Sequence, residues 1–589
     1  MRIKFTLWMT AVLTASLSAA TTPVATVEVR EGARGVCLTE MDGGELVEIP
    51  LEVLGTIGPS TPEGELVLVR LEGDRFERTG IIAGMSGSPV YVDGRLLGAL
   101  AYGWSFSEEP IGGVTPFVRM RGLAGGTIGG PSGGVADRRP TLSGLVDALR
   151  TGTLGDVLTD WLVPERAPAQ GFVPLAVPVS GGTPPVRWIA DSWSRLGWMA
   201  APAGGADPSP SRPIVPGAMV AGVLTRGDVS LAAGGTVTAV EDDRVWAFGH
   251  PFLGGGAIRL PLARARVIGV LPSQLSSFKF FTVGDTRGTF EVDRAHGIWG
   301  RLGQVAPMVP IEVAVDGRSY RFEAVRHATL TPLLVGYLTA TSHAAHGRTF
   351  GEQTVAVDVT TVFGDGRQAT YRDTFAGADA PATAAGMATA LVAYLEGSSF
   401  RRPDLDRVTV DLRTVEALET AEVVEIVPDR RSLRAGDELA ARVRVRPYRG
   451  EDVWHTLRVR VPEGTPPGRL DLVVADGASW TAYDLRMRPQ RPASFDDELA
   501  LVARLEPSTR LVAALERPDP ALVTGAGSVA VPVGVLLNLA GALGPDVPTA
   551  AWGVTGRVHV EVGQPVSGAA RIRLEVRPEG REPALEEVR

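Results

Sequence analysis

The sequence predicts a mainly β protein built from two β-barrel halves and a C-terminal Ig-like β-sandwich. Glycine (71 residues) and proline (44 residues) are both above average usage in this chain of 589 residues, and this composition favours short strands and turns over long helices. Short apolar segments separated by glycine turns run from 24 to about 120 and again from 218 to about 361. Between 439 and 461 apolar residues alternate with arginines, which indicates half-buried antiparallel strands with the arginines facing solvent.

The first 20 residues have the pattern of a secretory signal peptide. Arg2 and Lys4 form its charged region, residues 5–17 its apolar stretch, and the small residues at 18–20 its cleavage region. We therefore expect an extracytoplasmic protein, periplasmic or secreted, with an uncleaved anchor as the alternative. No later stretch reaches about 18 uninterrupted apolar residues, so no membrane span is expected once the signal is removed.

The chain is too long for one core, and shifts in composition divide it into parts. Apolar residues at helical spacing predict a broken helix over 142–162 and an amphipathic helix over 381–395. The expected parts are the signal peptide at 1–20, a serine-bearing barrel half at 21–135, a connector with helices and Pro/Gly-rich stretches at 136–217, a histidine-bearing barrel half with its closing helix at 218–420, and the sandwich with its tail at 421–589.

Composition also excludes several kinds of function. The formal net charge is −9 and the sequence contains no basic stripe, so nothing supports nucleic-acid binding. Cys37 is the only cysteine and lies among apolar residues, which predicts a small buried hydrophobe and rules out an intramolecular disulfide. Cysteine clusters, His-Glu-x-x-His, phosphate loops and strand-anchored dinucleotide motifs are all lacking, so no metal or organic cofactor is implied.

The run Gly84-Met85-Ser86-Gly87-Ser88-Pro89 lies between two strand-like segments. A serine between glycines, with a proline two residues after the second glycine, is how a chymotrypsin-type protease presents its nucleophile. The turn lifts the hydroxyl of Ser86 clear of the backbone, and the small residues let the N–H groups of Gly84 and Ser86 point at one spot where an oxyanion can form. The strands after it, joined by Asp93-Gly94, read as a hairpin that walls a substrate pocket. An ordinary Gly/Ser turn is the alternative.

A serine needs a base within hydrogen-bond reach, and His250 is the best placed of seven histidines. It ends a predicted hairpin over 235–247, which puts an imidazole at a strand terminus where a cleft can form. By contrast, His296, His343 and His346 lie in weaker turn contexts. His327, His455 and His559 read as isolated surface or rim residues. A hydrogen-bonded structural histidine is the alternative for His250.

Together the two motifs resemble the SpoIVB-type serine peptidases. The segment around Ser86 is similar to the Gly-Met-Ser-Gly-Ser-Pro signature of that family, and the segment from Gly235 to His250 is similar to its histidine region. The resemblance continues into 284–290 and 297–300 and covers about a third of the chain. It implies that Ser86 is the nucleophile and His250 the general base. In that family the histidine segment comes first, whereas here Ser86 precedes His250, which suggests that the two barrel halves are rearranged.

The sequence offers three candidates for the acid that completes a catalytic triad with Ser86 and His250. The resemblance implies an acid about fifteen residues before the serine, where this chain offers Glu72 and Asp74. A chymotrypsin-like arrangement takes the acid from the histidine's own barrel, where Asp293 is the obvious choice. Of the three, we favour Asp74. A solvated turn carboxylate is the alternative for each.

These expectations give a serine endopeptidase that cleaves protein or peptide substrates through an acyl-enzyme. The alternative is a catalytically inactive binding or scaffold protein that keeps the peptidase fold. The reversed segment order, the open choice of acid and the large accessory region keep this alternative in view.

Overall fold

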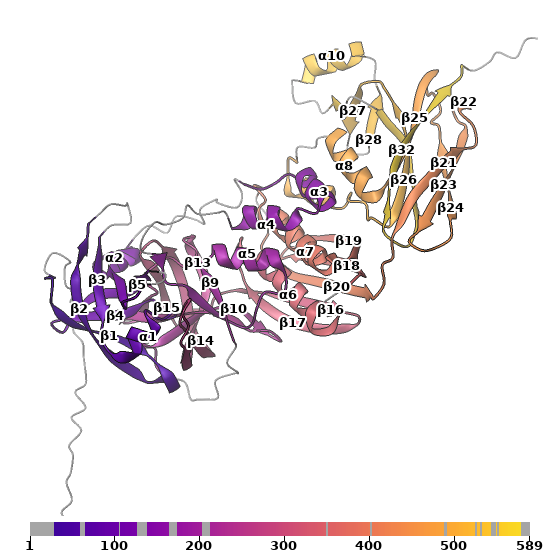
Figure 1. The fold of residues 1–589 in the computed structure, drawn as a ribbon. Helices are drawn as coiled ribbons and strands as arrows, with labels where there is room; N and C mark the ends of the chain where they lie inside the picture. Colours follow the sequence, from indigo (N-terminus) through magenta and orange to yellow (C-terminus); the bar gives the residue numbers. More distant parts are fainter. Residues whose placement is uncertain are drawn as a thin grey trace, which may run out of the picture.

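The computed structural model describes residues 29–58, 65–104, 107–125, 138–163, 173–202, 212–348, 351–400, 403–487, 492–524, 527–530, 533–543, 549–550 and 553–578. The protein is mainly β, with 49% strand and 22% helix, which confirms the predicted fold class at this level. Figure 1 shows an elongated molecule with the N-terminal strands at one end and the C-terminal sheets at the other. The predicted signal peptide and the first residues of the strand-rich segment predicted from 24 to about 120 lie outside the described residues.

The N-terminal part is a closed antiparallel barrel of six strands. They pair in the order β4-β1-β2-β3-β6-β5, and β4 also pairs with β5 and so closes the ring. Alternate residues point inward to a core that includes Cys37, as expected for this cysteine. The elements are β1 (Arg34–Glu40), β2 (Leu46–Ile57), β3 (Leu66–Leu71), α1 (Asp74–Thr79), β4 (Ser88–Val92), β5 (Arg95–Gly103), β6 (Ile111–Pro116) and α2 (Phe117–Arg121), with short 3-10 turns at Asp42–Gly44 and Gly122–Gly125.

The connector carries the broken helix that the sequence predicts. Thr141 caps its first half by accepting a hydrogen bond from the amide of Gly144, and left-handed Gly152 (φ 72°) ends it. The connector elements are α3 (Leu142–Thr151), α4 (Leu154–Leu162), β7 (Val173–Pro174), β8 (Val177–Ser180), α5 (Arg187–Arg195) and β9 (Trp198–Ala201).

A 13-stranded sheet follows, and six of its strands pair in a cycle. The order β10-β13-β14-β15-β12-β11 returns to its start because β10 also pairs with β11. The elements of this part are β10 (Met219–Gly227), β11 (Leu231–Glu241), β12 (Arg244–Ala247), β13 (Gly256–Leu271), β14 (Phe278–Arg294), β15 (Gly297–Leu302), β16 (Met308–Val315), β17 (Arg318–Val325), α6 (Leu330–His346), β18 (Gln353–Phe363), β19 (Gln368–Gly377), α7 (Ala380–Glu396) and β20 (Leu405–Val415).

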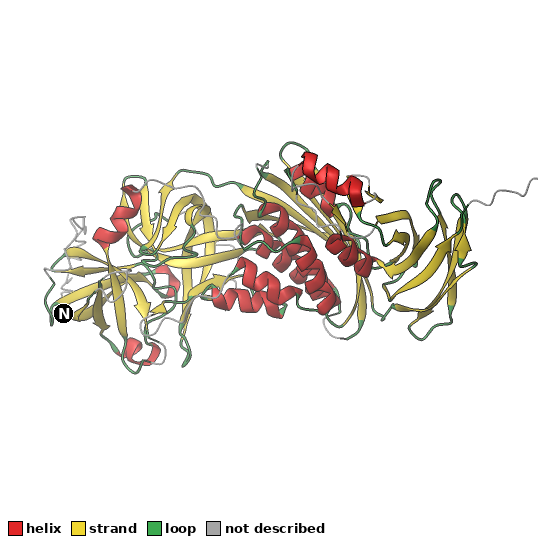
Figure 2. Cartoon of the chain, turned by 90° about the horizontal axis from the view of Figure 1, so that it is seen from above, coloured by secondary structure: helices red, strands yellow, loops and turns green. Residues whose placement is uncertain are grey.

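Two helices, α6 and α7, pack against each other and against strands of this sheet (Figure 2). Helix α7 confirms the closing helix predicted at 381–395. Helix α6 corrects the prediction of strands through 361. From Leu330 to Ala340 every residue of α6 is buried, so its apolar residues show no amphipathic period that distinguishes a helix from buried strands.

The C-terminal part has a four-stranded sheet, β24-β23-β21-β31, and a five-stranded sheet, β22-β32-β25-β26-β30, which share one core. Strand β23 buries Leu439, Ala441, Val443 and Val445 and turns its arginines outward, as the alternation predicts. Another sheet, β28-β27-β29, lies beside them. The elements are β21 (Ala421–Pro428), β22 (Ser432–Leu433), β23 (Glu438–Pro447), β24 (Val453–Arg460), β25 (Gly468–Asp476), α8 (Gly477–Met487), α9 (Phe495–Val502), β26 (Arg510–Arg517), β27 (Ala521–Thr524), β28 (Gly527–Ala530), α10 (Val533–Leu543), β29 (Thr549–Ala550), β30 (Gly553–Glu561), β31 (Val566–Ser567) and β32 (Ala569–Val576).

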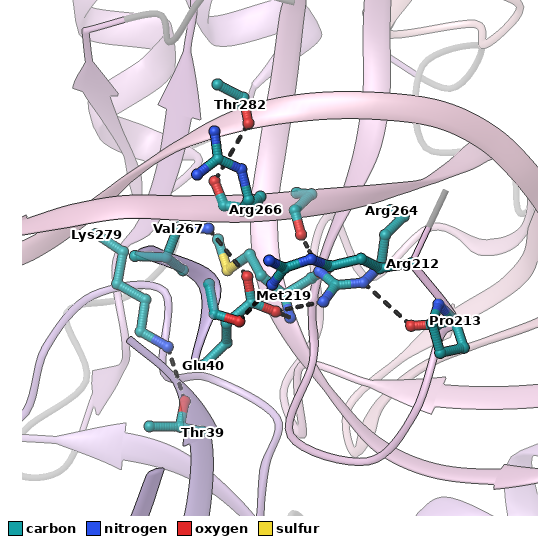
Figure 3. A network of polar contacts seen from close by, with 12 residues as sticks. Thr39, Glu40, Arg212, Pro213, Met219, Arg264, Arg266, Val267, Lys279 and Thr282 are labelled. Atoms are coloured by element: carbon teal, nitrogen blue, oxygen red, sulfur yellow. Dashed lines mark hydrogen bonds and ion pairs between the residues drawn. The ribbon is translucent and has the colours of Figure 1, made fainter. Parts of the chain in front are cut away.

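A buried polar network joins the N-terminal barrel to the large sheet (Figure 3). Glu40, at the end of β1, pairs with Arg264 of β13 at 2.5 Å, and the Glu40 carboxylate also accepts hydrogen bonds from the amides of Met219 (3.1 Å) and Val267 (3.0 Å). The side chain of Glu40 is fully buried and that of Arg264 is 10% exposed. This ion pair, with its carboxylate oxygens satisfied, holds the two parts in one orientation.

Among the described residues, no helix is both long enough and apolar enough to cross a membrane.

Candidate active site

The loop that carries Ser86 connects the end of α1 to β4 and is fixed at both ends. Before it, the amide of Ala83 donates to the carbonyl of Ser277 (2.8 Å), and the amide of Lys279 donates to the carbonyl of Ala83 (3.0 Å). After it, the amide of Gly87 donates to the carbonyl of Leu100 on β5 (2.8 Å). Strands β4 and β5 form the predicted hairpin, and its turn residues Asp93 and Gly94 have positive φ angles of 48° and 72°. The serine therefore precedes the first strand of a tight hairpin.

Strand β11, from the large sheet, holds the same loop from the other side. The amide of Thr236 donates to the carbonyl of Ser86 at 2.8 Å, and the Thr236 hydroxyl donates to the carbonyl of Gly84 at 2.8 Å. The hydroxyl of Thr238, two residues on along the same face of the strand, donates to the carbonyl of Gly87 at 2.8 Å. The position of the serine thus depends on both parts of the protein.

His250 lies just after the end of β12, at the junction between the N-terminal barrel and the large sheet where the Ser86 loop also lies. The amide of Phe248 donates to the carbonyl of Thr236 (3.3 Å), and Phe248 and Gly249 both have positive φ angles, of 66° and 70°. From the N-terminal barrel, the hydroxyl of Thr115 donates to the carbonyl of Gly249 (2.6 Å). The imidazole lies beside the ring of Tyr102 on β5, with 6.5 Å between centroids. The structure therefore brings Ser86 and the segment that carries His250 to the same junction, where both loops bond to Thr236.

The reactive atoms of both residues are buried and have no hydrogen-bond partner within the described chain. Ser86 is fully buried and His250 is 1% exposed, and neither Ser86 Oγ nor His250 Nε2 makes a hydrogen bond there. His250 Nδ1 lies 2.9 Å from the carbonyl oxygen of Pro251. Because a carbonyl only accepts, Nδ1 carries the proton, which leaves a lone pair on Nε2. Burial lowers the pKa of His250 to about 4, so the imidazole is neutral at pH 7 and able to take a proton.

Two backbone N–H groups beside Ser86 are available. The amides of Ala83, Met85, Gly87 and Ser88 all donate to backbone carbonyls. In the part of the chain that the structure describes, the amides of Gly84 and Ser86 donate to none. These are the two groups that the sequence predicts for an oxyanion site. The nucleophile's own N–H group and that of the residue two positions before it form the pair of donors that stabilises a tetrahedral intermediate in a chymotrypsin-type site.

The three candidate acids have different surroundings. The buried carboxylate of Asp293 accepts hydrogen bonds from the amides of Phe252 (2.8 Å), Leu253 (2.5 Å) and Gly254 (2.8 Å), in the loop that follows His250. Burial raises its pKa, although these backbone hydrogen bonds oppose the shift. Asp293 therefore positions the histidine loop, but the imidazole itself bonds to Pro251.

The favoured acid of the sequence prediction lies elsewhere. Asp74 is exposed at the start of α1 and makes no hydrogen bond or ion pair within the described chain. Glu72 is paired with Arg34. The structure does not bring either carboxylate to His250, because the imidazole is buried among Tyr102, Phe248 and the loop after it. The backbone carbonyl of Pro251 stands where a triad acid orients the imidazole.

One buried residue beside the serine loop was not predicted. Lys279 on β14 is fully buried, and its Nζ donates to Thr39 Oγ1 at 2.7 Å (Figure 3). The hydroxyl of Ser88 also donates to Thr39 Oγ1, at 2.9 Å. Burial lowers the pKa of Lys279 to about 7. Lys279 is one of only two lysines in the sequence, and this rarity was the signal available. Its backbone and side chain support both ends of the Ser86 loop.

Three of the other histidines lie at the two ends of α6. His327, predicted as a surface or rim residue, is half-buried, and its Nδ1 accepts hydrogen bonds from the amides of Thr329 (3.1 Å) and Leu330 (3.3 Å) at the start of α6. His343 and His346 lie in the last turn of α6, which corrects the prediction of turn contexts for them. Among the described residues, no group of three or more His, Cys, Asp or Glu side chains is arranged to hold a metal ion.

Comparisons of the chain with protein-family models, with curated proteins and with solved structures find no match.

Proposed function

We propose that the protein is a secreted or periplasmic serine endopeptidase with Ser86 as nucleophile and His250 as general base. One observation carries the proposal: two residues more than 160 positions apart meet at a junction of two sheets, each with its reactive atom buried and unpartnered. A buried hydroxyl or imidazole nitrogen without a partner costs stability, and the presence of one of each at a single junction favours a reactive pair. The pattern at 1–20 supports export.

The geometry supports the following sequence of steps. His250 Nε2 takes the proton of Ser86 Oγ as this oxygen bonds to the carbonyl carbon of a peptide, and the N–H groups of Gly84 and Ser86 stabilise the resulting oxyanion. When the C–N bond breaks, Nε2–H gives its proton to the leaving amine and an acyl-enzyme remains. Water then attacks the ester, with Nε2 again as base, and releases the carboxylic acid and the serine.

We interpret the cycle β10-β13-β14-β15-β12-β11 as a second barrel half, so that serine and histidine each come from one half of a chymotrypsin-like pair in rearranged order. This arrangement agrees with the resemblance to SpoIVB-type peptidases. We interpret the two C-terminal sheets around their common core as the Ig-like sandwich.

Labelling with a fluorophosphonate probe tests the proposal. Wild-type protein is compared with the Ser86→Ala, His250→Ala and Ser88→Ala variants. Ser88 is a sharp control because its buried hydroxyl lies two residues away and donates to Thr39. We expect labelling in the wild type and in Ser88→Ala, and its loss in Ser86→Ala and His250→Ala.

A catalytically inactive scaffold is the second candidate. The complete burial of Ser86 and the lack of a carboxylate on the imidazole favour it. Wild-type protein that never labels, while remaining folded, would make the scaffold the better description and would redirect the search to binding partners.

A further inference from the structure

The segment from Val173 to Ser180 crosses from one part of the protein to the other. Its first strand, β7, pairs antiparallel with β5 of the barrel, with Pro174 opposite Tyr102 and Val173 opposite Gly103. Its second strand, β8, pairs with β11 of the large sheet. We name residues 173–180 the strap.

The strap lies along the same edge of β5 as β4, the strand that follows the Ser86 loop. Strand β6 pairs with one edge of β5, up to Tyr102 opposite Gly113. Because a strand has two edges, β4 and β7 share the other. Along this edge β4 begins with Ser88 opposite Leu100, and β7 takes over at Tyr102. The strap therefore fills the edge positions directly beyond the Ser86 loop.

The strap then passes against the predicted oxyanion site. A Cβ atom on Gly84 would lie 3.3 Å from Cγ of Pro178, so the ring of this strap residue lies beside Gly84, whose N–H group is available. On the histidine side, β9 pairs parallel with β8 and places Trp198 on Phe252 of the histidine loop, with 5.3 Å between stacked rings. These contacts place the strap and β9 beside the two loops that carry Ser86 and His250.

From this arrangement we propose that the strap occupies the site of the substrate, and that the substrate is an extended polypeptide added as a strand to the Tyr102–Gly103 edge of β5. This inference rests on the proposed peptidase function and names its substrate class and its regulation. An extended peptide that joins a sheet edge gains backbone hydrogen bonds without a requirement for particular side chains. A covering segment that uses the same edge limits access to the serine, so the wild type reacts more slowly than a protein whose strap is displaced.

The sequence of the strap suits a cover that can be displaced. Its pairing with β5 covers only two residue pairs, Pro174 with Tyr102 and Val173 with Gly103. The amide of Leu175 donates to the carbonyl of Ala101 at 3.0 Å, and the Leu175 side chain packs over Gly103, where a Cβ atom would lie 2.9 Å from Leu175 Cδ2. Leu175 is therefore the main anchor of the strap on β5, and a peptide with more amide donors competes for this edge.

The Leu175→Pro variant tests the strap, with Ala176→Pro as its matched control. Leu175→Pro removes both the amide donor and the side chain over Gly103, whereas the amide of Ala176 donates to no group in the described chain. We expect Leu175→Pro to hydrolyse fluorescein-labelled casein about tenfold faster than wild type, with Ala176→Pro within about twofold. Equal rates in wild type and Leu175→Pro would overturn the proposal that the strap covers the substrate site and would leave the peptidase function intact. Leu175→Ser serves if thermal unfolding shows that the proline variant is not folded.

A binding measurement separates the two proposals because it needs no chemistry. The peptide Val-Pro-Leu-Ala-Val-Pro, which has the sequence of 173–178, is titrated into Leu175→Pro and wild-type backgrounds that both carry Ser86→Ala, with a scrambled peptide as control. We expect about tenfold tighter binding of the strap sequence to the Leu175→Pro background. Equal binding to both backgrounds would overturn the strap. Failure of every protein to label with the fluorophosphonate would instead overturn the peptidase function.

Discussion

The amide of Thr236 donates a hydrogen bond of 2.8 Å to the carbonyl oxygen of Ser86. Thr236 belongs to the large sheet and Ser86 to the N-terminal barrel, so the serine loop takes its conformation from a strand that follows it by 150 residues. The carbonyl of Thr236 in turn accepts from the amide of Phe248, two residues before His250. One residue thus sets the spacing between the proposed nucleophile and its base.

This close contact between backbones makes a sharp prediction for Gly87. A Cβ atom at Gly87 would lie 1.9 Å from the carbonyl oxygen of Thr236 and 2.5 Å from the amide nitrogen of Phe248. We expect Gly87→Ala to separate the two parts, to abolish fluorophosphonate labelling and to cost about 3 kcal/mol or more of stability.

The control is Gly94→Ala, in the turn of the same hairpin. Gly94 also has a positive φ, of 72°, but a Cβ atom there meets nothing within 4 Å. We expect it to cost about 1 kcal/mol and to keep labelling. Similar losses in the two variants, compared by thermal unfolding and labelling, would mean that backbone strain and not the junction limits the site.

The ion pair between Glu40 and Arg264 gives a prediction about what holds the two parts together. Glu40→Gln leaves the buried guanidinium of Arg264 without its counter-charge, which we expect to destabilise the protein by about 3–5 kcal/mol. The double variant Glu40→Gln/Arg264→Met removes this uncompensated charge and should recover much of the loss. Glu109→Gln, which breaks an exposed pair with Arg70, should cost less than about 1 kcal/mol. Urea unfolding followed by tryptophan fluorescence measures all three, and equal effects of the two single variants would contradict the role of the buried pair.

Burial of His250 predicts a pH dependence for the reaction. The folded pKa of about 4 lies below the ordinary value of 6.5, so the neutral base is present down to about pH 4. We expect the rate of fluorophosphonate labelling to fall with a midpoint near pH 4 as His250 becomes protonated. A midpoint near 6.5 would mean that the imidazole is solvated in the reacting state, for example after the strap has moved.

The same pKa predicts how stability changes with pH. Between pH 6.5 and about 4 the unfolded chain binds a proton at His250 that the folded chain does not, so the contribution of His250 is fully present above 6.5 and is lost as the pH falls. The slope is about 1.4 kcal/mol per pH unit. His327, whose pKa burial also lowers to about 4, contributes in the same direction. The difference in unfolding free energy between wild type and His250→Gln, measured from pH 4 to 6.5, isolates the contribution of His250 from that of His327. A difference that does not change with pH would contradict the burial of a neutral imidazole at position 250.

Local patterns in the sequence predicted the serine hairpin well because they depend on turn chemistry. Positive φ angles at Asp93 and Gly94 are a property of the hairpin turn itself, and the alternation at 439–461 directly reflects the two faces of a strand. Helix α6 was missed because it is buried along most of its length and therefore carries no amphipathic period.

The surroundings of the site could not be predicted, because they depend on pairings between distant segments. Nothing near Lys279 in the sequence indicates that its Nζ reaches Thr39, 240 residues earlier. Similarly, the position of the strap is set by register against β5 and β11 and not by its own composition. Asp74 was chosen by resemblance, and an exposed carboxylate on a short helix has no local feature that separates it from a catalytic acid.

Asp293 and Asp74 are both candidates for the acid that supports His250, and substitution of each by asparagine decides between them. Asp293→Asn replaces one acceptor oxygen by an NH2 group that faces amides of the histidine loop, so two donors oppose each other. We expect this variant to lower the labelling rate by about 10- to 100-fold while Ser86 stays reactive, because a misplaced base slows proton transfer. The apparent pKa of His250, followed by NMR, should move toward 6.5 as the loop loosens and water enters. Asp74→Asn should change neither quantity, because Asp74 is exposed and makes no hydrogen bond or ion pair within the described chain. Loss of labelling in Asp74→Asn with retention in Asp293→Asn would instead restore Asp74 as the acid, and would require α1 to move onto the histidine when substrate binds.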